Sequence, residues 1–201
     1  MDGAEVKLLG IDPGSEHSAF VVYDGERPLC FGKWANAALL RDIQVGRLGE
    51  TTNMAIETLK PRGMPTSFEE MQTQLFAGRL WQSWYDRQGG DKFALSAPEQ
   101  VFRHDVKMHL CGRANANDSN IRAALIDLFG GESKAIGGVK CRACKGKGWR
   151  GRNHDTCDYC NGGKWQHPPG PLNGVSADTW SALAIAVFHW ERVVKPAKFS
   201  A

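Results

Sequence analysis

The first part of the chain alternates short apolar runs with turn residues. Two apolar runs, at residues 8–12 and 19–23, are separated by a Pro-Gly turn at residues 13–14. Runs of this kind predict β-strands, and the pair predicts an antiparallel hairpin. Residues 29–35 supply a third strand and residues 52–59 a fourth. The pattern therefore predicts a sheet in this part of the chain.

A longer apolar pattern with spacings of three and four predicts a helix after these strands. Ser67 and Glu70 match a capping box, so the helix is expected to begin after Ser67 and to run to about Arg87. One apolar face of this helix is expected to pack on the sheet. The residues of that face are Phe68, Met71, Leu75, Gly78, Trp81 and Tyr85.

Shorter patterns predict the elements on either side of this helix. Residues 36–50 favour a short helix, although glycines interrupt it. Residues 93–96 favour a short buried strand that ends before Pro98. Because proline suits the first turn of a helix, residues 98–100 are expected to open a helical turn.

Two more helices are expected in the second half of the chain. Asn117 or Asp118 is expected to cap one that ends near Phe129. Ser176 is a good N-cap for the last one, which places Asp178 in its first turn. The helix dipole favours a carboxylate there, so Asp178 has a structural interpretation as well as a functional one.

Asp12 is the single carboxylate of the first apolar run. A carboxylate is unfavourable in a core, so it is expected at a strand end that faces a cleft, where cations can compensate its charge. A plain strand-to-turn aspartate is the alternative.

Composition and charge narrow the class of protein. With 201 residues and 42% hydrophobic content, the chain can form one good-sized core and a small appended module. The net charge is +3, but residues 139–167 hold seven Lys or Arg against two Asp, so positive charge gathers there. The sequence contains no secretory apolar stretch and no run that could span a bilayer, which predicts a soluble, cytoplasmic protein.

Two CxxC pairs lie within the basic segment. Twelve residues separate Cys144 of the pair Cys141/Cys144 from Cys157 of the pair Cys157/Cys160. This spacing predicts one structural zinc ion held by four thiolates, with a redox dithiol as the minor alternative. The glycine-containing repeat resembles the zinc-binding repeats of DnaJ-type chaperones.

Tryptophan and basic residues surround these cysteines and suit contacts with phosphates and stacked bases. The alternative is a solvated basic knuckle whose tryptophans cover its small core. The candidate nucleic-acid-binding residues here are Lys145, Lys147, Trp149, Arg150 and Arg152.

Three stretches, in order, resemble RuvC-type Holliday junction resolvases of the RNase H-like nuclease superfamily. Residues 10–15 (GIDPGS) resemble the family's opening, residues 54–57 its central strand with a catalytic glutamate, and residues 176–186 its last helix. The resemblance implies an α/β fold with a mixed five-stranded sheet flanked by helices. It also implies a nuclease core over residues 1–138 and 172–201, with a zinc-binding insertion over residues 139–171.

This resemblance implies a catalytic site made of Asp12, Glu57 and Asp178, which would hold two Mg²⁺ ions, with Mn²⁺ able to substitute. The implied activity is a crossover junction endodeoxyribonuclease of DNA recombination and repair, a homodimer that resolves four-way DNA junctions by paired nicks. Trp84 is a candidate for the dimer interface. The zinc insertion suggests a divergent, phage-type enzyme of the bacterial or phage-infected cell.

The sequence departs from the family pattern at Ser181, where a second acid usually follows one turn after Asp178. Either Ser181 or a water replaces that ligand, or Asp178 supplies both roles, or catalysis is lost. The family's aromatic wedge aligns with Lys60 and its basic residue with Asp118. Arg103 and Arg122 are alternative DNA contacts, and the set expected to bind DNA in the core is Lys60, Arg62, Lys107 and Arg113.

Two other functions stay open from the sequence. The chain is also consistent with an RNase H-like nuclease that cuts another branched or hybrid nucleic acid. Because Ser181 weakens the metal site, a non-catalytic protein that binds junctions is the third possibility.

Overall fold

A computed structural model describes residues 6–60, 63, 65–87, 96–151 and 153–196. The chain divides into two compact units, one formed by Met1–Ile121 with Val175–Ala201 and the other by Arg122–Gly174. The predicted boundaries of the zinc insertion, at residues 139 and 171, both lie within the second unit.

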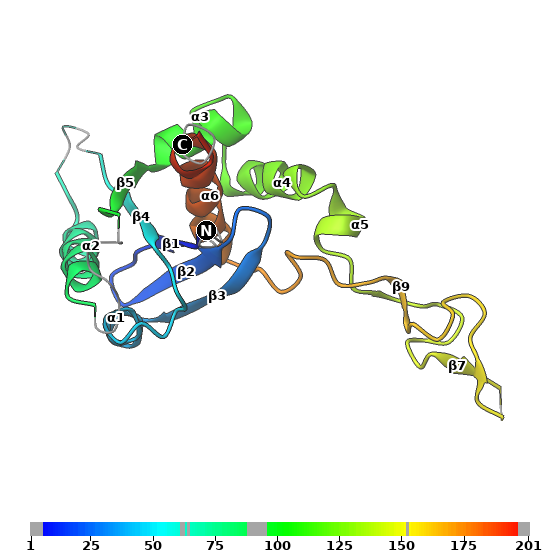
Figure 1. The fold of residues 1–201 in the computed structure, drawn as a ribbon. Coiled ribbons are helices and arrows are strands. Elements are labelled where there is room, and N and C mark those ends of the chain that lie inside the picture. The colour runs from blue at the N-terminus through cyan, green and yellow to red at the C-terminus, as the bar shows by residue number, and fades with distance from the viewer. Residues whose placement is uncertain (1–5, 61–62, 64, 88–95, 152, 197–201) are drawn as a thin grey trace. The chain divides into compact units, whose positions relative to one another are not determined.

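The first unit is built on a mixed five-stranded sheet (Figure 1). Strands β1, β2 and β3 form an antiparallel meander, and β4 and β5 extend the sheet from β1 in parallel. The strand order is β3-β2-β1-β4-β5. This arrangement confirms the predicted fold class. The strands are β1 (Leu8–Asp12), β2 (His17–Tyr23), β3 (Pro28–Ala35), β4 (Asn53–Thr58) and β5 (Glu99–Phe102).

Side chains alternate between the two faces of this sheet, and helices cover both faces (Figure 1). Leu9, Ile11 and Ile56 belong to a buried cluster with residues of α1 (Asn36–Gln44) and α2 (Phe68–Tyr85). Gly10 points to the opposite face, where an added Cβ would lie 2.8 Å from the carbonyl oxygen of Ala182 in α6. Strand residues whose side chains lie on the same face of the sheet as Gly10 therefore face α6 (Thr179–His189).

Helix α2 begins as predicted but buries a different face. The Ser67 side chain accepts a hydrogen bond from the Glu70 N–H, and the Glu70 carboxylate accepts one from the Ser67 N–H, which confirms the capping box. The face predicted to pack on the sheet is exposed, with Phe68 at 74%, Met71 at 59% and Leu75 at 63%. The buried residues are instead Phe76, Ala77, Leu80, Ser83 and Trp84. Trp84 is fully buried, so it cannot serve in a dimer interface as predicted.

Two other local predictions are wrong. Residues 99–102 form β5 rather than a helical turn, because pairing with β4 satisfies their backbone, and α3 (Arg103–Cys111) follows at once. The predicted strand at residues 93–96 falls largely outside the described residues. Helix α6 begins one residue after Asp178, not after Ser176, and it continues as a π-helical turn over Trp190–Val194.

The second unit contains most of α4 (Asp118–Leu128) and the short helix α5 (Glu132–Ala135). Two small antiparallel ribbons follow, in which β6 pairs with β9 and β7 with β8. Their strands are β6 (Val139–Lys140), β7 (Trp149–Arg150), β8 (Asp155–Thr156) and β9 (Trp165–His167). In the part of the chain that the structure describes, every helix is too short or too polar to cross a bilayer.

Candidate metal centre and nucleic-acid interface

Asp12 and Glu57 are brought together by the register of two parallel strands. Ile11 of β1 pairs with Ile56 of β4, so the next residue of each strand, Asp12 and Glu57, lies at the same level of the sheet. Both carboxylates lie on the same face of the sheet as Gly10, the face that α6 covers. The negative charge of Glu57 contributes to raising the pKa of Asp12, which shows that the two groups interact.

Helix α6 brings Asp178 and Ser181 to the same place. Its close approach at Gly10 lays the helix across β1, and the Ser181 hydroxyl lies near enough to Asp12 to lower the pKa of that carboxyl. Asp178 is the N-cap residue, but its side chain caps no backbone N–H. The preceding Ala177 has a φ of 44°, a left-handed conformation that is unfavourable for a residue with a Cβ. The Asp178 carboxylate is therefore not used in capping and instead pairs with Lys33 of β3.

The pKa of Asp12 reflects its burial first and the neighbouring acids second. Burial raises the pKa of Asp12 to about 7, and the charges of Glu57 and Asp178 add to the effect. Arg103 and the Ser181 hydroxyl lower it in part. Burial also raises the pKa of Glu57, against the lowering effect of Arg103. Burial thus disfavours the charged form of both carboxyls, and a cation bound to them would favour it.

The donor set fits a hard cation. Asp12 and Glu57 lie at neighbouring positions of β1 and β4, and Asp178 and Ser181, at the start of α6, are near enough to influence the pKa of Asp12. All four side chains offer oxygen donors. Mg²⁺ and Mn²⁺ prefer such ligands and keep several waters. Asp12, Glu57 and Asp178 are the side chains that could hold a divalent ion here. In the arrangement described, the Asp178 and Glu57 carboxylates are each turned to a basic side chain.

Comparison with known proteins agrees with the fold. Neither any protein-family model nor any curated protein matches the sequence. Among solved structures, Thermus thermophilus RuvC in complex with a Holliday junction substrate matches with a TM-score of 0.55 and 14% identity, over 92% of this chain and 92% of that one. A second Thermus thermophilus RuvC structure matches with a TM-score of 0.54 and 14% identity, over 94% of this chain and 97% of that one.

This chain has a RuvC-like fold. At 14% identity the likeness shows the architecture alone, so the chemistry is argued from this chain's own residues.

Lys33 lies beside the acids at a position that the sequence did not reveal. Its Nζ lies 2.6 Å from Asp178 Oδ2, and both side chains are about half exposed, at 48% and 51%. Lys33 pairs with Ala19, which pairs with Asp12, so the three side chains form one row across β3, β2 and β1. The only signal in the sequence is a lysine inside an otherwise apolar strand.

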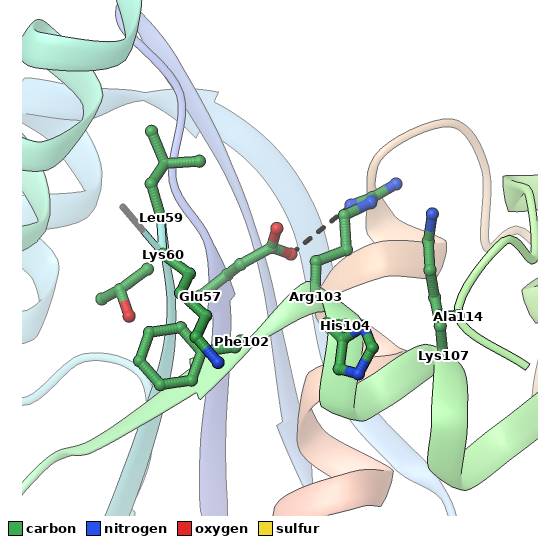
Figure 2. A pocket seen from close by; sticks show the side chains of 9 residues that line it. Glu57, Leu59, Lys60, Phe102, Arg103, His104, Lys107 and Ala114 are labelled. Carbon is green, nitrogen blue, oxygen red and sulfur yellow. Dashed lines mark hydrogen bonds and ion pairs between the residues drawn. The ribbon is translucent and has the colours of Figure 1, made fainter. Parts of the chain in front are cut away.

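Arg103, the first residue of α3, compensates Glu57. Its Nη1 lies 3.4 Å from Glu57 Oε2, and its Nη2 donates to Asp118 Oδ1. Figure 2 shows the Glu57 carboxylate turned toward this guanidinium. The sequence suggested Arg103 only as an alternative DNA contact. Its pairing with Glu57 depends on β5 lying beside β4, which the local pattern did not predict.

A basic pocket of about 390 Å³ opens beside Glu57 (Figure 2). Two predicted DNA-binding residues, Lys60 and Lys107, line it, and Lys60 Nζ lies 5.8 Å from the centroid of the Phe102 ring. Arg113 is exposed in the loop after α3, and Arg62 lies outside the described residues. The lining residues are Glu57, Thr58, Leu59, Lys60, Phe102, Arg103, His104, Lys107 and Ala114. Positive charge thus lies directly beside the acids.

The four cysteines of the second unit form a compact cluster. Among the described residues, they are the one group of three or more His, Cys, Asp or Glu whose ligand atoms lie within 4.8 Å of one another. Cys141 Sγ lies 3.9 Å from Cys157 Sγ, and Cys144 Sγ lies 3.7 Å from Cys160 Sγ. A tetrahedron of sulfurs about 2.3 Å from a zinc ion has edges of roughly 3.8 Å. The cluster could therefore hold zinc.

The backbone after each CxxC pair explains the glycine repeat. Gly146 and Gly162 have φ values of 81° and 76°, a conformation that glycine adopts without strain. The N–H of Gly148 donates a hydrogen bond to Cys144 Sγ over 3.2 Å. These turns hold each cysteine pair in the curled shape that a four-thiolate site needs.

The basic residues around this cluster are largely exposed. Lys145, Lys147 and Arg150 are exposed, whereas Arg152 lies outside the described residues. The half-buried Trp149 ring lies edge-on to His154, with centroids 3.9 Å apart, and Lys147 Nζ lies 4.9 Å from its centroid. A cationic surface with an aromatic ring is thus present in the second unit by itself.

Proposed function

We propose that this protein is a divalent-metal-dependent endonuclease that cuts four-way DNA junctions. The observation that carries this proposal is that Asp12 and Glu57 lie at neighbouring positions of parallel strands in a RuvC-like fold, where the charge of Asp178 also acts on Asp12. These acids come from distant parts of the sequence, and nothing in the packing of the core requires three carboxylates together. A cation-holding site is the physical reason for such an arrangement.

The acids have distinct tasks in this proposal. Asp12 is the central ligand, since it lies between Glu57 on β4 and Ser181 on α6. Glu57 and Asp178 would complete the ligand set. Bound Mg²⁺ ions would activate the attacking water and stabilise charge on the phosphate. The Ser181 hydroxyl orients Asp12 and contributes no charge of its own.

Nucleic acid is proposed to follow the basic pocket beside Glu57. Lys60, Arg103 and Lys107 can neutralise phosphates on either side of the cut bond, and Phe102 offers an apolar ring to the sugar or base. The solved Thermus thermophilus RuvC that matches this chain is in complex with a Holliday junction substrate. This supports a branched DNA substrate over a linear one.

We further propose that two copies associate through the exposed apolar face of α2. Phe68, Met71 and Leu75 occupy neighbouring turns of that face and are all more than half exposed. A two-fold dimer would present two equivalent sites to a nearly two-fold junction, which suits paired nicks. Leu75→Glu should convert the dimer to monomer in sedimentation velocity. A wild-type protein that sediments as a monomer at every concentration would contradict this.

A non-catalytic junction-binding protein is the second candidate. The observation that favours it is the Lys33–Asp178 ion pair together with a serine at position 181, since both weaken the hold on a second metal ion.

The decisive experiment compares cleavage of a four-way junction, linear duplex and RNA/DNA hybrid in Mg²⁺ and in Mn²⁺. Preferential, symmetric nicking of the junction supports the resolvase. Equal cleavage of the hybrid would point to a different nuclease, and tight junction binding without nicking to the second candidate.

A further inference from the structure

Lys33 occupies a position from which it can serve two partners. Its Nζ contacts Asp178 Oδ2 at 2.6 Å, and the charge of Asp12 acts on it as well. The residue between Lys33 and Asp12 on the sheet is Ala19, whose side chain is short. Lys33 therefore approaches the acids from the β3 side of the sheet, whereas Arg103 approaches them from the β5 side.

The Lys33–Asp178 pair is a poor candidate for a purely structural role. Both side chains are about half exposed, and ion pairs in such surroundings contribute little to stability. Asp178 is also one of the proposed metal ligands. A divalent ion at Asp178 would repel the ammonium group, so the two cations compete for the same carboxylate.

We propose, on the basis of the function proposed above, that Lys33 exchanges the Asp178 carboxylate for a phosphodiester oxygen of the nucleic acid when a divalent ion binds. The Lys33 backbone is fixed in β3 and its stem is flexible, so the released ammonium stays beside the acids. The phosphate to be cut must lie at these acids. A lysine ammonium binds phosphate as a mobile point charge, which suits it to this exchange.

Such an exchange also addresses the charge balance of the cluster. Ser181 offers a neutral hydroxyl and leaves three carboxylates at the site, so two divalent ions would be incompletely neutralised by protein ligands. Asp178 is held by Lys33 before the ion arrives, and Lys33 then stabilises the negative phosphate. Lys33 is accordingly a positioning residue toward Asp178 and a ligand of the substrate.

The test measures two effects of opposite sign in Lys33→Met, with Lys33→Arg as the conservative variant. The matched control is Lys195→Met, in the helical turn after Val194, about 25 Å from Asp178 by helical rise. In calorimetric titrations with Mn²⁺ and no DNA, Lys33→Met should bind the ion about two- to fivefold more tightly than wild type. In Ca²⁺, the slope of log K for junction binding against log salt should become shallower by about 0.9. Lys195→Met should leave both unchanged.

Single-turnover cleavage adds a third reading. At saturating Mn²⁺, Lys33→Met should cleave roughly tenfold more slowly, and Lys33→Arg should recover part of the loss. An unchanged Mn²⁺ affinity or an unchanged salt slope in Lys33→Met would overturn the exchange, even if the wild type cleaves junctions. A wild type that binds junctions but does not cleave them would remove the proposed nuclease activity, while these two titrations would still decide the role of Lys33.

Discussion

The backbone of Gly10 lies directly against Ala182: a Cβ at position 10 would come within 2.8 Å of the Ala182 carbonyl oxygen. The same atom would lie 2.8 Å from the Cβ of Ala186. Only a glycine at position 10 of β1 therefore allows the backbone of α6 to pack this closely on the sheet. Because Ser181 and Asp178 precede this contact on α6, the crossing sets their distance from Asp12.

Gly10→Ala should therefore affect both stability and the site. Overpacking of this kind destabilises by about 1–3 kcal/mol, which denaturant unfolding would measure. The displaced helix should also weaken Mn²⁺ binding in calorimetry. Gly78→Ala in α2 is the control, since an added Cβ there meets nothing within 4 Å, and it should stabilise by about 0.5–1 kcal/mol. An undisturbed Gly10→Ala protein would show that α6 is not held by this contact.

The sequence predicted those parts of the fold whose signals are local. Turn residues and apolar runs defined the first strands, and the pattern of Ser67 and Glu70 defined the beginning of α2. It did not predict which face of α2 is buried. Apolar residues occur on two faces of that helix. Which face is buried depends on contacts with residues far away in the sequence, such as Ile56, and the spacing of apolar residues does not reveal these contacts.

The candidate site divides in the same way. Asp12, Glu57 and Asp178 were identified from family-like motifs, and their joint role as metal ligands stays a prediction; in the structure, Glu57 and Asp178 both act on the pKa of Asp12. Lys33 and the pairing of Arg103 with Glu57 could not be predicted, because each depends on the register of strands that are far apart in the sequence. Such cross-strand neighbours become visible only once the sheet order is known.

Ser181→Asp should strengthen the metal site. The new carboxylate would lie beside Asp12 and add a charged ligand where a hydroxyl stands now. We expect Mn²⁺ affinity to rise by roughly tenfold and junction cleavage to accelerate, because carboxylates bind hard cations better than hydroxyls. Ser181→Asn, which adds no charge, is the matched control in calorimetry. Equal Mn²⁺ affinity in Ser181→Asp and wild type would place the metal away from this helix.

The cysteine cluster should contain one zinc ion per chain. Elemental analysis of the purified protein would measure it, and Cys157→Ser should lose it because the tetrahedral set is then incomplete. Cys111→Ser, outside the cluster, is the control and should retain the metal. Loss of zinc should also make residues 122–174 more sensitive to proteolysis. A wild-type protein purified without zinc, yet resistant there, would contradict the assignment.

His189 should make stability depend on pH. Burial lowers the pKa of His189 from 6.5 to about 4, so the folded protein favours the neutral ring. The stability that this contributes is complete above pH 6.5 and is lost as the pH falls toward 4. At pH 5 the loss should be about 2 kcal/mol. When the pH is lowered from 8 to 5, the free energy of unfolding should fall by about 2 kcal/mol less in His189→Leu than in wild type. Equal losses in the two proteins would exclude His189 as the cause.

The central claim is that Asp12, Glu57 and Asp178 form one metal-binding catalytic site, and Asp12→Asn tests it most directly. The control is Asp24→Asn. Asp24 accepts hydrogen bonds from the backbone N–H groups of Glu26 and Arg27, and an asparagine side-chain oxygen can accept the same bonds. Calorimetry with Mn²⁺ and junction cleavage should be measured on the same preparations. The account predicts that Asp12→Asn loses metal binding and at least about a hundredfold in cleavage, while Asp24→Asn keeps both. Wild-type Mn²⁺ affinity and cleavage in Asp12→Asn would contradict it.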